Sequence, residues 1–212
     1  MLNELQIDLL KEYVNVFIGK AASMLSEIAN QRVILSVPDI EIISMQHGSN
    51  NEIESNMLFH HGHIVSSSMK FGNDFSGRAL LIFPANKAKM LVDACMGEFT
   101  QLEEDVDPIE LADTDFDVLK EISNIILNSV IGEFGNLLGV KLEFSMPDID
   151  LLFVSEDEQK MYLESDVHML MLYTTFMLEN TRIQGVVIVA LGMNSLNMVI
   201  SKIDEVLGEL NE

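Results

Sequence analysis

The sequence carries one stretch twice: DVLKEISNIILNSVIGEFGNLLGVKLEFSMPDI at residues 117–149 and DLLKEYVNVFIGKAASMLSEIANQRVILSVPDI at residues 8–40. Laid over each other without a gap, the copies lie 109 positions apart. They share Asp8/Asp117, Leu10/Leu119, Lys11/Lys120, Glu12/Glu121, Asn15/Asn124, Ser36/Ser145, Pro38/Pro147, Asp39/Asp148 and Ile40/Ile149. A repeat of this kind predicts two halves of the same fold. We therefore divide the chain into a first half (1–97), an acidic connector (98–116) and a second half (117–212), which together form a single domain.

Each copy begins with an amphipathic helix. Apolar residues recur at helical spacing and predict one buried stripe per helix: Leu10, Val14, Phe17, Ala21, Met24 and Ile28 in the first, and Leu119, Ile126, Val130 and Leu137 in the second. At about 100° per residue, an acid–acid–amide row occupies the side away from each stripe. The rows are Asp8, Glu12 and Asn15, and Asp117, Glu121 and Asn124.

An exposed row of acids and an amide is also what an ordinary solvated helix surface shows. Two observations favour a functional role. Asparagine is a poor residue for a helix interior, yet Asn15 and Asn124 hold the same place in both copies. The apolar positions have changed identity between the copies, for example Phe17 against Ile126, while the Glu and the Asn are unchanged.

The remaining segments of each half predict a strand, a hairpin and a last helix. We expect strands at 32–37, ended or edged by Pro38, and at 141–146, and hairpins at 63–83 and 166–191. Helices are expected at 84–96 and 193–208, ended by Gly97 and Gly208. Glycines 132 and 135 inside the second motif helix predict close packing against another element. The result is an α+β fold of two pseudo-twofold-related halves with mainly antiparallel strands.

Composition narrows the class of protein. The chain has 212 residues, 48% of them hydrophobic, and a net charge of −22. Such a charge repels phosphate backbones and anionic lipids, so we expect neither nucleic acid nor membrane as a partner. No apolar run has membrane-spanning length, and the start of the chain has no basic segment of a secretory signal. The single cysteine, Cys95, excludes an internal disulfide, and a cytoplasmic location is expected.

The motif rows resemble the CheC/CheX/FliY family of response-regulator phosphatases. The family pattern is Asp or Ser, three residues, Glu, two residues, Asn, twenty-two residues, Pro. This chain has it twice, as Asp8, Glu12, Asn15 and Pro38, and as Asp117, Glu121, Asn124 and Pro147. The resemblance covers essentially the whole chain. Two motifs without a C-terminal switch-binding domain look most like the CheC branch, whose CheC-like fold is the one expected here.

The resemblance implies a phosphatase that hydrolyses the aspartyl phosphate of a CheY-type response regulator in chemotaxis or related two-component signalling. It implies that Asn15 and Asn124 orient the attacking water and that Glu12 and Glu121 pair with a lysine of the regulator. Asp8 and Asp117 then have a supporting role, and Pro38 and Pro147 a structural one. Both motifs are intact, so both sites should work. No cofactor of its own is expected, because Mg²⁺ belongs to the regulator.

The sequence also allows other interpretations. A non-catalytic adaptor on the same fold would bind a response regulator or a CheD-type receptor deamidase without turnover. His60, His61 and His63 could begin a metal site, but no third ligand is in view, and we predict none. The 14 methionines could form an adaptable binding surface, but positions such as 24, 90 and 146 favour core filling.

Overall fold

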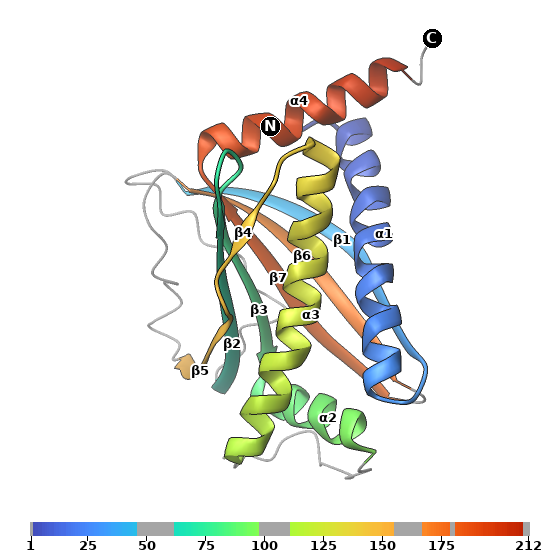
Figure 1. The fold of residues 1–212 in the computed structure, drawn as a ribbon, viewed down its shortest axis with the longest axis vertical. Helices are drawn as coiled ribbons and strands as arrows, with labels where there is room; N and C mark the ends of the chain where they lie inside the picture. The colour runs from blue at the N-terminus through green and yellow to red at the C-terminus, as the bar shows by residue number, and fades with distance from the viewer. Residues whose placement is uncertain (1, 46–61, 98–110, 155–166, 179–180, 210–212) are drawn as a thin grey trace.

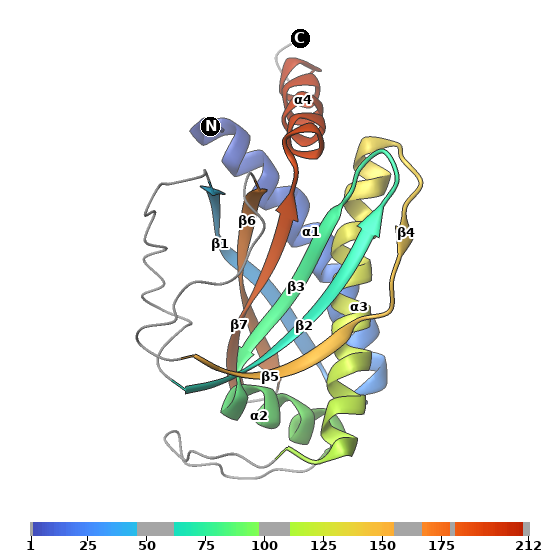
Figure 2. The ribbon, with the colours of Figure 1, turned by 90° about the vertical axis from the view of Figure 1, so that its left-hand side faces the viewer.

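A seven-stranded sheet carries two long helices side by side on one face, with a shorter helix near each end of the sheet (Figures 1 and 2). The structure is a computed structural model that describes residues 2–45, 62–97, 111–154, 167–178 and 181–209. The helices are α1 (Glu4–Ile28), α2 (Ala85–Met96), α3 (Asp113–Leu138) and α4 (Met193–Glu209). The strands are β1 (Val33–Met45), β2 (Gly62–Gly72), β3 (Gly77–Pro84), β4 (Glu143–Phe144), β5 (Asp148–Val154), β6 (Val167–Leu178) and β7 (Thr181–Leu191).

The sheet has the order β1-β6-β7-β3-β2-β4, with β5 also paired to β2, and the described pairings are antiparallel. The strand that follows each motif helix therefore pairs with the hairpin of the other half. β1 lies against β6, while β4 and β5 lie against β2. The α+β class and the antiparallel sheet are confirmed. From either edge, the sheet begins with the strand that follows a motif helix and continues with the hairpin of the other half, as a pseudo-twofold arrangement requires. The internal duplication itself stays a prediction.

The ends of the helices follow from local chemistry. Asn3 begins α1 with a capping box, in which Gln6 N–H donates to its side chain and its own N–H donates to the Gln6 side chain. Asn30 follows α1 at φ 49°, a left-handed conformation that asparagine tolerates. Gly97 and Gly139 end α2 and α3 in the same conformation, as predicted. The last helix does not end at its predicted stop but runs one residue beyond it, to Glu209.

The core lies between the sheet and the α1–α3 layer. At its centre the ring of Phe134 on α3 contacts Phe17 on α1 at 5.4 Å between centroids, edge to face, and Phe75 at 6.1 Å. Aromatic pairs of this geometry contribute about 0.5–1.5 kcal/mol beyond their buried area. The same pairing holds the two motif helices together, and the Lys20–Glu133 ion pair, at 2.6 Å, joins them nearer the surface.

The predicted apolar stripe of α1 is wrong at its C-terminal end. Met24 and Ile28 are 42% and 54% exposed, and Leu25 is buried in their place. The methionine expectation fails there and at Met146, which is 69% exposed, whereas Met90 packs against the core. The physical reason is that α1 meets β1 on one flank and α3 on another, so that its buried face turns away from the simple stripe near the end of the helix.

Two glycines in α3 have different surroundings, although the sequence predicts close packing for both. A Cβ atom on Gly135 would lie 2.9 Å from Leu142 Cδ1 and 3.1 Å from the Val140 carbonyl oxygen. A Cβ atom on Gly132 would meet nothing within 4 Å. Close packing is therefore confirmed at Gly135 and wrong at Gly132.

Alanine at these two positions should change stability in opposite directions. Gly132→Ala should raise the free energy of unfolding by about 0.5–1 kcal/mol, because alanine has the better helix propensity. Gly135→Ala should lower it by about 1–3 kcal/mol, because Leu142 and the turn at Gly139 must move. Urea unfolding followed by circular dichroism measures both, and equal effects at the two positions would contradict this packing.

Candidate functional site

The motif residues lie on the flanks of α1 and α3 that the core leaves uncovered. On α1 the side chains of Asp8, Glu12 and Asn15 are exposed. On α3 the corresponding Asp117 and Glu121 are exposed. The structure thus places both predicted rows on helix surfaces, with each Glu and the Asn three residues later on neighbouring positions of one helix.

The two motif prolines follow at the sheet. Pro147 is buried, and for Pro38 only the backbone belongs to the described part of the chain. Of the two alternatives for Pro38, the edge position is confirmed: β1 does not end at Pro38 but passes through it, and β1 is an edge strand of the sheet. Ser36 pairs with Thr175 and Asp39 with Tyr173. Two residues of β1 therefore stand opposite one residue of β6, which is a β-bulge. Proline has no N–H to donate to the ladder, and the Val37 backbone beside it needs another partner.

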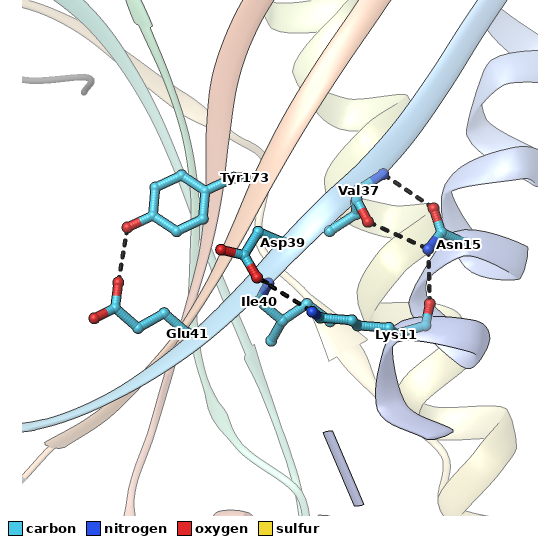
Figure 3. Close-up of polar contacts among 7 residues, drawn as sticks. All are labelled: Lys11, Asn15, Val37, Asp39, Ile40, Glu41 and Tyr173. Atoms are coloured by element: carbon cyan, nitrogen blue, oxygen red, sulfur yellow. Dashed lines mark hydrogen bonds and ion pairs between the residues drawn. The ribbon is translucent and has the colours of Figure 1, made fainter. Parts of the chain in front are cut away.

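Asn15 supplies that partner. Its Oδ1 accepts from the Val37 N–H at 3.0 Å, and its Nδ2 donates to the Val37 carbonyl at 3.3 Å and to the Lys11 carbonyl at 2.9 Å (Figure 3). A carboxamide has two N–H donors, so both are used within the chain. Asn15 therefore faces the bulge of β1 and bridges the motif helix to the strand, rather than pointing straight to solvent.

Beside this bridge lie charged contacts along β1. Lys11 Nζ is 3.2 Å from Asp39 Oδ1, which also accepts from the Ile40 N–H at 3.0 Å. Tyr173 donates to Glu41 Oε2 at 2.9 Å (Figure 3). Burial and then the bond to Glu41 raise the pKa of Tyr173 to about 12, so its hydroxyl stays protonated at neutral pH. Lys11, which both copies of the repeat share with Lys120, is thus paired within its own half.

In the second half, the strand pairing differs at the position that corresponds to the β1 bulge. Phe144 pairs with Phe71 and Asp148 with Ser68, so that three residues of the second half stand opposite two of β2. Ser145 fills this break: its N–H donates to the Lys70 carbonyl at 2.9 Å, and its hydroxyl accepts from the Lys70 N–H at 2.9 Å. The bulge is held by a serine of the strand, without the motif asparagine.

Asn124 consequently has other contacts. Its Oδ1 accepts from Nδ2 of Asn128, one helical turn further along α3, at 2.6 Å. Within the described part of the chain, the Nδ2 group of Asn124 has no hydrogen-bond partner. Both donors of the amide are therefore available at the second site, whereas both are used at the first.

Sequence reasoning missed an ion-pair cluster between α2 and α3. Lys89 Nζ lies 2.8 Å from Asp93 and 3.1 Å from Asp115, and both carboxylates are buried. Asp115 also accepts from the Ala112 N–H at 2.9 Å and so begins α3. Hydrogen bonding to Asp93 and Asp115 outweighs burial and raises the pKa of Lys89. The spacing of Lys89 and Asp93 was the available signal, and the cluster fixes the start of the second motif helix.

Other candidate chemistry is poorly supported. Among the described residues no group of three potential ligands could hold a metal ion, and two of the three clustered histidines lie outside the described ranges. Burial raises the pKa of the Cys95 thiol to about 11, so little thiolate exists at neutral pH for nucleophilic attack. No helix in the described segments is both long and apolar enough to span a membrane.

Two proteins named as phosphatases are similar to the chain in sequence. No model of a protein family matches the chain. The flagellar motor switch phosphatase FliY of Bacillus subtilis is 24% identical over 157 residues, which cover 74% of this chain and 38% of FliY. The CheY-P phosphatase CheC of the same organism is 22% identical over 150 residues, covering 71% of this chain and 68% of CheC. The match thus spans little more than a third of FliY.

A solved structure has the same fold. The X-ray crystal structure of Thermotoga maritima FliY superimposes with a TM-score of 0.75 at 17% identity, covering 97% of this chain and 98% of that one. The likeness extends over the sheet and the helices described above. It establishes that the arrangement of elements in this chain is that of the CheC/FliY fold.

The different contacts of the two asparagines predict different effects on stability. Asn15→Ala should lower the free energy of unfolding by about 1–3 kcal/mol, because the N–H and carbonyl of the buried residue Val37 lose their partner. Asn124→Ala, the matched control, should change it by less than about 0.5 kcal/mol. Urea unfolding of both variants tests the bridge, and a larger loss at position 124 would contradict it.

Proposed function

We propose that this chain, a CheC/CheX/FliY family protein by its similarity to FliY and CheC, is a phosphatase acting on the aspartyl phosphate of a CheY-type response regulator. The proposal comes from two relatives whose names state a phosphatase, one of them acting on CheY-P.

One observation carries the proposal. Glu121 and Asn124 lie three residues apart on the uncovered flank of α3, and the Asn124 amide keeps both N–H donors available in the described part of the chain. Side chains at i and i+3 emerge next to each other, so one helix can present both groups to a shallow phosphorylation pocket. An acidic side chain for docking and a carboxamide for orientation are then delivered together.

The phosphatase needs to supply few chemical groups for this reaction. Phosphoryl transfer depends mainly on positioning and on stabilising charge, and the regulator brings its own Mg²⁺ and lysine. The missing part is an oriented water in line with the bond that breaks. A carboxamide oxygen can accept from this water while its N–H donates to a phosphoryl oxygen. No cofactor of the chain itself is part of this proposal.

The residues have distinct roles in this scheme. The amides of Asn124 and Asn15 orient water, and Glu121 and Glu12 pair with the lysine of the regulator. Asp8 and Asp117, one turn earlier on the same flanks, support the docking surface without touching the reacting atoms. The two motif prolines hold the strand behind each helix at its bulge, and we give them a structural role.

Recognition must be local, because the net charge of −22 repels another acidic surface. Lys120 precedes the motif Glu121 and is exposed, and no ion pair within the described ranges involves it. Lys11, its counterpart in the first half, is bound by Asp39. The second motif therefore presents the cation that an acidic phosphorylation pocket would attract. A CheD-type deamidase as a further partner stays a prediction.

The double variant Asn15→Ala with Asn124→Ala should lose the acceleration of dephosphorylation while binding to the regulator is largely retained. The amides act on water and phosphoryl oxygens in the transition state, whereas the Glu side chains that dock are untouched. The measurement is the decay of a phosphorylated CheY-type regulator with and without the protein, together with a binding isotherm. Asn136→Ala, an exposed asparagine of α3 outside the motif, is the matched control.

Three outcomes separate the possibilities. Acceleration by the unmodified protein that is lost in the double variant supports the proposal. Binding without acceleration by the unmodified protein would replace it with an adaptor function. Full activity of a folded double variant would overturn the assignment of the amides while leaving a phosphatase.

A further inference from the structure

We propose that Asn128 is a positioning residue of the second site, and that this site accounts for most of the turnover. The inference rests on the proposed phosphatase function and goes beyond the family motif, which does not include position 128. It comes from the hydrogen bond between Asn128 Nδ2 and Asn124 Oδ1, at 2.6 Å. Both side chains are partly buried on the same flank of α3.

The two copies of the repeat differ at this position. Asn128 follows the motif asparagine by one helical turn in the second copy, and Gly19 occupies the matching place in the first. Gly19 has no side chain with which to hold an amide. Asn15 instead turns back to the Lys11 carbonyl and across to the backbone of Val37. The residue one turn after the motif thus distinguishes an amide held on the helix from an amide bound to the strand.

A count of donors and acceptors gives the chemical consequence. An asparagine side chain has two N–H donors and an oxygen with two lone pairs. Asn15 uses both donors within the chain, so none remains for a phosphoryl oxygen. Asn124 uses one lone pair, on Asn128, and keeps the second for a water and its donors for the phosphoryl group. Only the second amide is set up for both contacts.

Releasing Asn15 for the reaction would be costly. The N–H and carbonyl of the buried residue Val37 lie at a bulge of the edge strand β1, and without the amide they would lose their hydrogen bonds. The second half bears no such cost, because Ser145 already pairs with the backbone of Lys70 at the matching bulge. The first asparagine must therefore leave its contacts with the strand before it can act on a phosphoryl oxygen, whereas the second is available for catalysis as it stands.

The loss experiment uses variants at position 128. Asn128→Gly introduces the residue of the first copy, and Asn128→Asp keeps the shape but removes the donor. Each should lower kcat for hydrolysis of a phosphorylated CheY-type receiver domain by about tenfold, the usual scale for one lost hydrogen bond in a catalytic assembly, with KM changed by less than about twofold. Asn128→Gln restores a donor and should recover part of kcat. Gly19→Ala is the matched control, and its kcat should equal that of the unmodified protein.

A double-mutant cycle separates positioning from a general structural effect. In a background with Asn15→Ala, where only the second site remains, Asn128→Gly should again lower kcat by about tenfold. In a background with Asn124→Ala, where only the first site remains, it should have no further effect, because its partner is gone. Among the single variants, Asn124→Ala should lose more activity than Asn15→Ala at temperatures where all variants are folded.

The failures can be told apart. If the unmodified protein does not accelerate hydrolysis, the proposed function falls and this inference with it. If the protein is active and Asn128→Gly matches it, or lowers kcat equally in both backgrounds, the positioning role is overturned while the phosphatase stands. A greater loss from Asn15→Ala than from Asn124→Ala would overturn the inequality of the sites.

Discussion

The pairing of each half's first strand with the hairpin of the other half is the constraint on which the structure depends. β1 follows α1 directly yet lies against β6, and β5 follows α3 yet lies against β2. Neither half can complete its own sheet, so the core under α1 and α3 forms only when both halves are present. A strand that must reach across in this way has its register set by distant residues. The position of each bulge relative to its motif helix follows from that register.

The bulges connect the fold to the chemistry. Each comes at a Ser-x-Pro-Asp sequence, where a proline removes a donor from the ladder and one extra residue enters the strand. Backbone groups at a bulge lose their partners in the ladder, and each half supplies others. The first half uses the amide of its motif asparagine, and the second uses the hydroxyl and backbone of Ser145. Because the two halves pair the backbone at their bulges differently, Asn15 is hydrogen-bonded to the strand, and Asn124 is hydrogen-bonded to Asn128 instead.

Charge follows a similar division. The chain is strongly acidic, and some of its few cationic side chains are paired with carboxylates while others are exposed. Lys89 is held between two buried carboxylates, where it joins α2 to α3 and cannot serve recognition. Lys11 is paired with Asp39 on the surface, a contact that contributes little to stability. Lys120 is exposed beside the second motif, so a positive charge and an available amide occur on the same helix.

The sequence by itself determined the helices, the hairpins and the motif rows. It did not determine the second half's strands, because the predicted strand at 141–146 is only β4 (Glu143–Phe144), and β5 (Asp148–Val154) was not expected. Helical periodicity, the stops at Asn30, Gly97 and Gly139 and the alternation of the hairpins are local properties, and local propensities decide them. Tertiary structure alone decided the exchange of strands, the exposure of Met24 and the state of each asparagine. Asn15 and Asn124 look equivalent in the repeat, but their hydrogen-bond partners differ. Strand register brings Val37 to Asn15, and a neighbouring side chain of the same helix, Asn128, binds Asn124. The contact of Asn15 with Val37 depends on which surfaces meet in space, and no spacing along the chain specifies it, whereas the contact of Asn124 with Asn128 is made within one helical turn.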